Sequence, residues 1–175
     1  MARFREVYET YSSMVYNVCL NYLHNTQDAE EATQDVFVRI HGSLNSYCQK
    51  ATLKTWIYRI AVNHCFDRVK ANKAQKRFAQ IQSLFGIGKN EITPVDFNHP
   101  GVKLEDQEAV SEIMKAIHAL PENQKTALIL KSVEGLSQKE IAAVMEIGEK
   151  AAESLLSRAK VNLKRMLNDK EGNVF

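Results

Sequence analysis

The sequence lacks the long apolar segments that would tie the protein to a membrane. No stretch of its 175 residues approaches the roughly 18 uninterrupted apolar residues that a membrane span needs. The N-terminal segment MARFREVYETYSSMVYNV spreads charges and tyrosines where a secretion signal would have a basic start and an apolar block. We therefore predict a globular protein that stays in the cytoplasm and inserts into no membrane.

Cysteine is scarce as well. Cys19, Cys48 and Cys65 are odd in number, lie far apart and form no CxxC pair, which argues against a disulfide framework or a zinc ribbon. We expect three buried, reduced thiols, because cysteine is among the most buried residue types. Metal or redox chemistry at Cys65 and His64 is the alternative, but neighbours on a helix point about 100° apart. No further ligands accompany them, and we predict neither a metal nor a cofactor.

Common catalytic patterns are also missing. The chain has no Gly-rich phosphate loop, no metal-ligand spacing and no nucleophile elbow. Asp35 and His41 could be paired on paper, but their spacing puts them on different faces of a helix. The absence of a constellation favours a binding protein over an enzyme, with no catalytic residues.

Charge is present but unevenly distributed. The whole chain has a net charge of only +2, whereas residues 1–49 carry −3 and residues 50–77 carry +7. A concentrated basic segment is typical of a surface that binds a polyanion. A merely solvated helix face is the alternative for a basic run taken alone.

Apolar residues recur at helical spacing almost throughout, and strand signals are few. One stripe runs from Phe4 to Leu23, and Asn25 or Thr26 is a good N-cap for the next helix. The expected inner face of that second helix consists of Ala29, Ala32, Val36, Phe37 and Ile40. After a break at residues 42–52, the stripe of a third, basic helix consists of Leu53, Trp56, Ile57, Ile60, Ala61 and Val69. Three such helices can close a small core.

The helical pattern dissolves at residues 78–104, where GIGKN, TPVD and FNHPG bring in glycine, proline and turn residues. This segment, with IQSLF as a short apolar island, indicates an irregular linker. Helical spacing resumes at about Glu105. We therefore predict an all-α fold with two small helical domains, residues 1–77 and 105–175, joined by that linker.

A helix-turn-helix is predicted in the second domain. Pro121 fits the first turn of a helix that ends at Gly135. The segment SQKE, residues 137–140, then has the form of a capping box that opens a short helix. A tight turn at Ile147 and a longer helix over 149–167 complete the layout.

Two stretches together resemble the sigma factors of bacterial RNA polymerase, in the extracytoplasmic-function (ECF) group. The first is DAEEATQDVFVRIHGSLNSY followed by TLKTWIYRIAVNHCFDRVK, and the second is LPENQKTALILKSVEGLSQKEIAAVMEIGEKAAESLLSRAKVNL. The resemblance implies a sigma region 2-like domain, a region 4-like helix-turn-helix domain, and promoter-directed transcription initiation without catalysis. An autonomous helix-turn-helix regulator is the alternative, although it leaves the TWIYRIAVN half unexplained.

The resemblance also implies three partners: the RNA polymerase core enzyme, promoter DNA and an anti-sigma factor. Core polymerase would be bound by an acidic helix face that comprises Asp28, Glu31, Gln34 and Asp35. Their spacing of about one turn, away from Val36 and Ile40, is compatible with such a surface. An ordinary solvated face is the alternative.

The loop and helix that follow resemble the part of these factors that melts the minus-10 element and captures a flipped base. Aromatic stacking, polar edge contacts and a cationic groove hold single-stranded bases. The residues that supply these types at matching positions are Tyr47, Lys54, Trp56, Arg59, Asn63, Arg68 and Lys70. Periodicity alone would instead place Trp56 in the core.

The last helix resembles the one that reads the minus-35 element as duplex DNA. Its expected contacts are Lys150, Glu153, Ser154, Ser157 and Arg158. Glu153 and Leu155 stand where the commonest pattern has basic residues. A glutamate can accept from a cytosine amino group in the major groove, so we expect Glu153 to change the sequence that is read, and Leu155 to pack inward.

Overall fold

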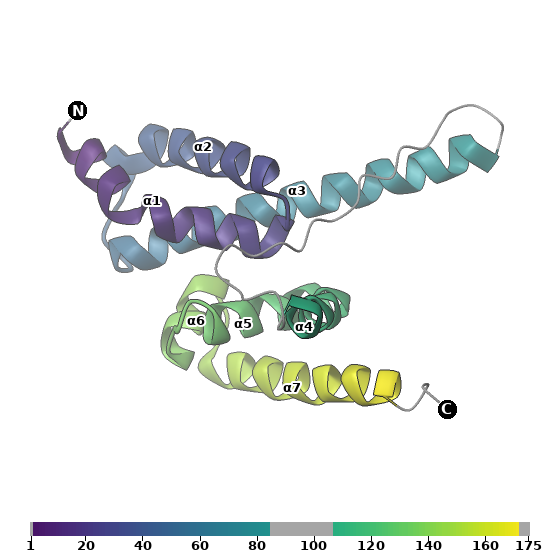
Figure 1. The fold of residues 1–175 in the computed structure, drawn as a ribbon. Coiled ribbons are helices and arrows are strands. Elements are labelled where there is room, and N and C mark those ends of the chain that lie inside the picture. The colour runs from purple at the N-terminus through teal and green to yellow at the C-terminus, as the bar shows by residue number, and fades with distance from the viewer. Residues whose placement is uncertain (1, 85–106, 172–175) are drawn as a thin grey trace. The chain divides into compact units, whose positions relative to one another are not determined.

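The computed structural model describes residues 2–84 and 107–171, and every regular element in these ranges is a helix. The helices divide between two compact units (Figure 1). The predicted all-α fold with two small helical domains is confirmed. No helix of the described part is long and apolar enough to cross a membrane.

The first unit contains α1 (Ala2–Leu23), α2 (Thr26–Ser43), a short 3-10 turn (Leu44–Ser46) and α3 (Leu53–Leu84). All three α-helices pack against one another. Their shared core includes the fully buried side chains of Val15, Val18, Val36, Ile40 and Ile57. The three apolar stripes thus close one core, as the sequence predicts.

The start and the inner face of α2 follow from its sequence. Asn25 has an extended backbone, and its side chain accepts a 2.9 Å hydrogen bond from the Asp28 amide, so it is the N-cap. The buried residues of α2 are Ala29, Ala32, Val36, Phe37 and Ile40. These are the five residues predicted for its inner face.

The third helix is longer than expected. Its start is capped by Thr52, whose hydroxyl accepts from the Thr55 amide at 3.2 Å. The helix then continues to Leu84, seven residues past the predicted domain end at residue 77. The segment from 78 to 84 contains no glycine or proline, and the first breaker is Gly86. The rest of the predicted linker, residues 85–104, lies outside the described residues.

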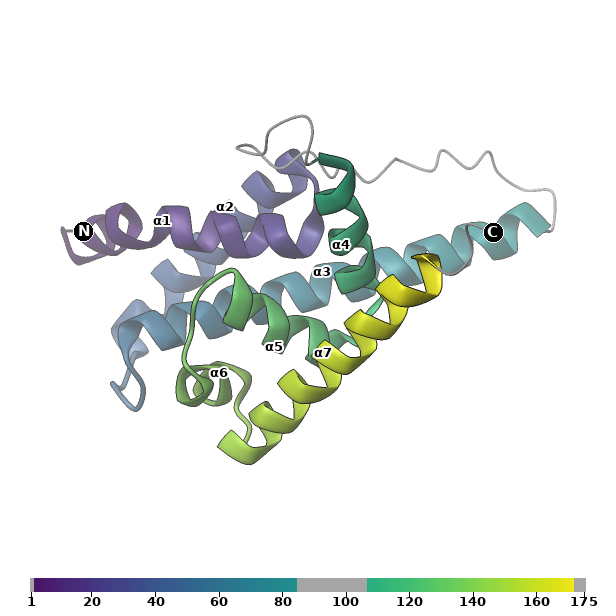
Figure 2. The ribbon, with the colours of Figure 1, turned by 60° about the horizontal axis from the view of Figure 1, so that its bottom comes forward.

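The second unit contains α4 (Gln107–Ala119), α5 (Glu122–Ser132), α6 (Gln138–Met145) and α7 (Glu149–Glu171). Helix α7 packs against each of the other three (Figure 2). Leu120, Leu128 and Ala159 form the centre of one apolar cluster in this unit. Gly135, three residues after the end of α5, takes the left-handed backbone conformation, at φ 67°, which glycine adopts without steric cost.

The expectation for the cysteines is correct at two of the three positions. Cys19 and Cys65 are buried and free, with their sulfurs 3.8 Å apart. Cys48 is exposed. It lies in the loop before α3, next to exposed Gln49 and Lys50, and this position outside the helices explains why the general burial preference of cysteine fails there.

Candidate nucleic-acid and partner interfaces

An aromatic pair marks the junction between the loop and α3. The Tyr47 and Trp56 rings lie 5.2 Å apart at an interplanar angle of 41°, and the Tyr47 hydroxyl donates to the Ala51 carbonyl. Both side chains are half-buried. Trp56 is therefore not the core residue that periodicity alone predicts, and its ring lies beside that of the loop tyrosine.

Three of the predicted nucleic-acid residues of α3 share one side of the helix. Trp56, Asn63 and Lys70 are spaced seven residues apart, which brings side chains back to nearly the same direction on an α-helix. Asn63 and Lys70 are exposed, and Arg59, one turn from Asn63, is half-buried. This side of α3 thus combines an aromatic ring, an amide and cations, the types that hold unstacked bases.

Lys54 stands apart from that side of the helix. It lies in the first turn of α3, about 160° around the axis from Trp56. Its ammonium group is 5.8 Å from the centre of the Tyr58 ring. It is exposed and lies near the loop, so it adds positive charge at the helix start.

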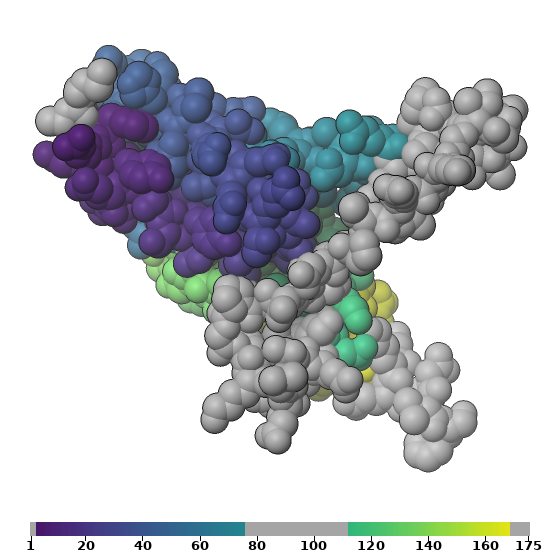
Figure 3. All heavy atoms as spheres, turned by 45° about the horizontal axis from the view of Figure 1, so that its top comes forward, coloured from purple at the N-terminus to yellow at the C-terminus, as the bar shows by residue number. Residues whose placement is uncertain are grey.

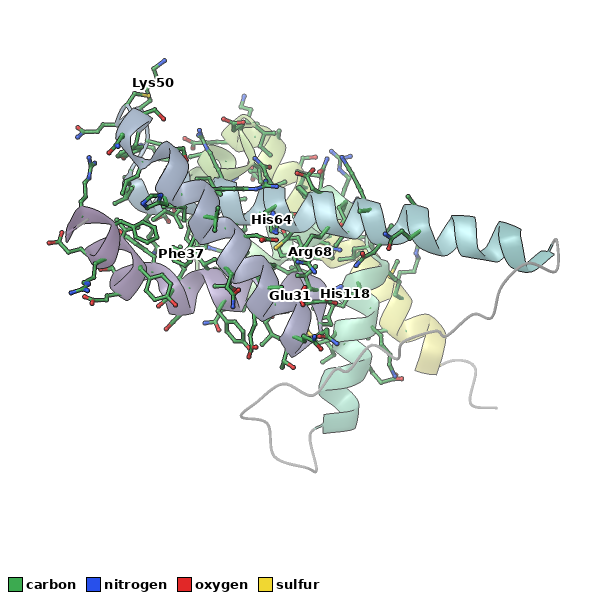
Figure 4. The ribbon with its side chains drawn as sticks, turned by 90° about the horizontal axis from the view of Figure 1, so that it is seen from above. Glu31, Phe37, Lys50, His64, Arg68 and His118 are labelled. Carbon is green, nitrogen blue, oxygen red and sulfur yellow. The ribbon has the colours of Figure 1, made fainter. Side chains whose placement is uncertain are left out.

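Arg68 pairs with the acidic helix. One guanidinium nitrogen lies 3.2 Å from Asp28 Oδ1 and 3.2 Å from Glu31 Oε2, and the other lies 3.7 Å from Asp35 Oδ2. Figure 4 shows Arg68 of α3 and Glu31 of α2 on the facing sides of their helices. The structure therefore joins a residue predicted to bind DNA to three residues predicted to bind core polymerase. Helical periodicity gives no signal for a contact between residues about 40 positions apart, so sequence reasoning missed it.

His64 borders the same acidic cluster, and sequence reasoning gave it no role there. Its Nε2 lies 3.4 Å from Asp35 Oδ2, and its side chain is buried. Burial, reinforced by Arg39, lowers the pKa of His64, although the Asp35 carboxylate acts in the opposite direction. The lowered pKa favours the neutral form of the histidine, which adds no positive charge to the cluster.

Gln34 lies on a different side of α2 from this carboxylate cluster. It lines an open groove of about 460 Å³ between α1 and α2, together with Tyr8, Tyr16 and Thr33. Figure 3 shows α1 and α2 side by side on this face of the first unit. The four residues predicted to bind core polymerase therefore divide into a carboxylate cluster facing α3 and one amide facing α1.

The predicted capping box is present at the start of α6. The Ser137 hydroxyl accepts from the Glu140 amide at 3.3 Å, and the Glu140 carboxylate accepts from the Ser137 amide at 2.8 Å. The helix ends at Glu146, which takes a left-handed conformation, and α7 begins at Glu149. Gln138 donates to the Glu149 carbonyl at 3.2 Å and ties the two helices together. This is the helix-turn-helix geometry that the sequence predicts.

The first turns of α7 present the predicted duplex contacts to solvent. Lys150, Glu153, Ser157 and Arg158 are exposed, and Ser154 is half-buried. Arg158 donates to the Ser154 hydroxyl at 2.7 Å, which orients its guanidinium along the helix. The exposed face thus offers a carboxylate, hydroxyls and cations, the groups that read base edges and bind phosphates.

The inward side of α7 is built on small residues. Ala152 and Ala159 are fully buried, while Leu155 is only half-buried. Sequence reasoning expects Leu155 to pack inward and gives Ala152 no such place. Its spacing of seven residues from Ala159 was the available signal, and two alanines on one side let the neighbouring helices approach closely.

No metal-binding cluster is found where the structure describes the chain. Its described residues contain no group of three or more histidine, cysteine, aspartate or glutamate side chains that could hold a metal ion. Asp35 points to Arg68 and His64, whereas His41 packs edge-on against the Phe4 ring, with the ring centres 4.9 Å apart. Asp35 and His41, which could be paired on paper, therefore have different contacts and do not form a pair.

Comparison with protein families assigns both halves of the chain. Residues 7–75 match the family model "Sigma-70 region 2", and residues 111–163 match "Sigma-70, region 4". The first range contains α2, the loop and most of α3, and the second contains the helix-turn-helix. The aromatic and amide side of α3, the carboxylate cluster of α2 and the exposed start of α7 therefore lie within the matched residues.

Full-length relatives match the same organisation. The chain is 26% identical to the ECF RNA polymerase sigma factor SigW of Bacillus subtilis, over 95% of this chain and 89% of the relative. It is 29% identical to SigM of the same organism, over 93% of this chain and 94% of the relative. Both relatives align with the two halves in one order along the chain.

Solved structures share the fold. The sigma factor RpoE from Bartonella quintana, in complex with the anti-sigma factor NepR, matches with a TM-score of 0.68 at 20% identity, over 96% of this chain and 98% of that one. CnrH in complex with the cytosolic domain of CnrY matches with a TM-score of 0.66 at 17% identity, over 95% and 88%. These likenesses concern the arrangement of the helices.

Proposed function

The chain belongs to the extracytoplasmic-function group of bacterial RNA polymerase sigma factors and acts in promoter-directed transcription initiation; from this premise we propose which surfaces bind its partners. The observation that carries the proposal is the presence of two nucleic-acid surfaces of different kinds in one chain. One is the aromatic and amide side of α3, suited to unstacked bases, and the other is the exposed start of α7, suited to a duplex.

We assign the minus-10 element to the first surface. Tyr47 and Trp56 provide rings on which a base can stack, and Asn63, exposed on the same side of α3 as Trp56, can bond the edge of a flipped base. Lys54, Arg59 and Lys70 supply positive charge for the phosphates. Arg68, which the sequence places in the same set, is bound by three carboxylates of α2.

The minus-35 element is assigned to the start of α7. Lys150 and Arg158, both exposed, bind phosphates, with Ser154 and Ser157 between them in the sequence. Glu153, exposed in the second turn, accepts a hydrogen bond from a cytosine amino group. The assignment is supported by the helix-turn-helix that places this end of α7 outward.

Core polymerase is assigned to α2. The carboxylates of Asp28, Glu31 and Asp35 are each between about two-fifths and three-fifths exposed, so a basic partner surface can approach them. Gln34 extends the contact toward the groove on the α1 side. We further propose that the protein acts in the cytoplasm, performs no catalytic step of its own and is held by an anti-sigma factor.

Reconstituted transcription tests the proposal. The purified chain and core polymerase should together start transcription at specific promoters, while core polymerase alone should not. Replacing Tyr47 and Asn63 by alanine should damage promoter opening and leave core binding intact, whereas Asp35→Lys should have the opposite effect. Equal loss of both activities in each variant would contradict the assignment of separate surfaces.

A gel shift with the isolated protein separates this function from that of an autonomous regulator. A sigma factor of this size is expected to bind promoter duplex poorly without core polymerase. Tight, sequence-specific binding by the isolated chain, together with failure to bind core polymerase, would favour the autonomous helix-turn-helix regulator.

A further inference from the structure

Arg68 faces away from the proposed minus-10 surface. Trp56, Asn63 and Lys70 mark one side of α3, and Arg68 lies about 140° around the helix axis from Asn63. A base held against the exposed Asn63 amide would therefore lie across the helix from the Arg68 guanidinium. Its position in the basic segment does not make Arg68 part of that surface.

The guanidinium of Arg68 lies at the base of the acidic cluster. The Arg68 side chain is 24% exposed, whereas the side chains of Asp28, Glu31 and Asp35 are 41%, 55% and 57% exposed. All three carboxylates thus direct one oxygen toward Arg68 while a large part of each remains open to solvent. The arginine is on the inner side of the cluster and the carboxylates are on the outer side.

One planar cation suits this arrangement better than a point charge. Three carboxylates that converge on one point repel each other, and a guanidinium offsets the repulsion with donors held in a rigid fork. The α2 helix supplies the acids at spacings of three and four residues, and α3 supplies the arginine, so the pairing also fixes the two helices against each other. His64 lies beside Asp35, and in its neutral form it adds no charge to the three carboxylates and the guanidinium.

From this geometry we infer that Arg68 is a positioning residue of the core polymerase surface: it holds the carboxylates of Asp28, Glu31 and Asp35 in the arrangement that polymerase binds, and it makes no contact with promoter DNA. The inference rests on the proposed function of α2, because it needs the acidic cluster to be the polymerase contact. It moves Arg68 from the minus-10 set to the opposite side of α3.

Arg68→Gln tests the inference, and Lys70→Gln is the matched control, because Lys70 is an exposed cation two residues away on the proposed DNA side. Two affinities are measured for each full-length variant, well below its unfolding temperature. The first is for core polymerase. The second is the affinity of the holoenzyme, formed at saturating core, for a promoter fragment selected from random DNA with the wild-type holoenzyme.

We expect Arg68→Gln to weaken core binding by about tenfold and to change promoter binding by less than about twofold. Lys70→Gln should do the reverse. Arg68→Lys keeps the charge without the fork, so it should fold and recover part of the lost core affinity. If Arg68 acted on stability alone, the core affinity of each folded variant would be unchanged. A partial rescue by lysine therefore indicates that Arg68 positions the carboxylates.

Two results would overturn the inference. One is unchanged core affinity in folded Arg68→Gln, and the other is weaker promoter binding by its holoenzyme at saturating core. Both leave the proposed function standing if the wild-type chain binds core polymerase and Asp35→Lys does not. Failure of the wild-type chain to bind core polymerase would instead count against the proposed function.

Discussion

His118, in the last turn of α4, is held in its neutral form by the second unit. Burial, reinforced by the nearby charge of Lys125, lowers the pKa of His118 to about 4. The folded pKa lies below the unfolded value near 6.5, so between these values the unfolded chain binds a proton that the folded chain does not. The free energy of unfolding of this unit should therefore fall as the pH drops from 6.5 to 4, by up to about 3 kcal/mol.

Urea unfolding between pH 7 and pH 4, followed by helical circular dichroism, measures this effect. His118→Gln should lose most of the pH dependence of the second unit. His41→Gln, a change at an exposed histidine of the first unit, should keep it. The same slope in wild type and His118→Gln would show that other groups cause the acid sensitivity.

Glu153 carries the clearest prediction for specificity. It is exposed on the second turn of α7, where a carboxylate accepts from cytosine and an arginine donates to guanine. Glu153→Arg should therefore exchange a cytosine for a guanine at one position of the upstream element, with about 1–3 kcal/mol of discrimination. Selection of random upstream elements with each holoenzyme measures the change. Identical preferences would place Glu153 outside the groove.

At the scale of the element, the capping box fixes where α6 begins. Ser137 and Glu140 satisfy one another's backbone amides, and removal of an N-cap hydroxyl costs about 1 kcal/mol of stability. Ser137→Ala should lower the free energy of unfolding of the second unit by that amount. Lys139→Ala, an exposed change in the same turn, is the control and should have little effect. Equal stability of Ser137→Ala and wild type would mean that the reciprocal bonds contribute nothing in solution.

The sequence predicts a helix and its inner face where the apolar period and the capping residue agree. It does not predict contacts between residues of different helices. The five inner residues of α2 follow from its 3.6-residue period and its cap at Asn25. The predicted domain end at residue 77 falls within α3, because the apolar stripe fades before the first helix breaker, Gly86. The pairing of Arg68 with Asp28, Glu31 and Asp35 depends on how α2 packs on α3, and periodicity within one helix carries no information about it.

At the scale of the whole molecule, each unit has a core of its own. Ile40 and Ile57 are fully buried in the first unit, and Leu130 and Ile141 are fully buried in the second. The spectroscopic probes are divided as well, because the single tryptophan, Trp56, and all six tyrosines lie within residues 1–58. Tryptophan fluorescence therefore reports unfolding of the first unit, while circular dichroism reports both.

Separate cores predict separate unfolding transitions. Residues 1–84 and residues 105–175, produced as two polypeptides, should each be helical, and each should match its transition in the full chain to within about 0.5 kcal/mol, since distant independent sites add. Only the polypeptide of residues 105–175 should show the pH dependence of His118, and only that of residues 1–84 should bind core polymerase through α2. The contrary outcome has two parts: the full chain unfolds in a single transition that coincides by fluorescence and circular dichroism, and either polypeptide is unfolded when alone. That outcome would show that the two cores stabilise each other.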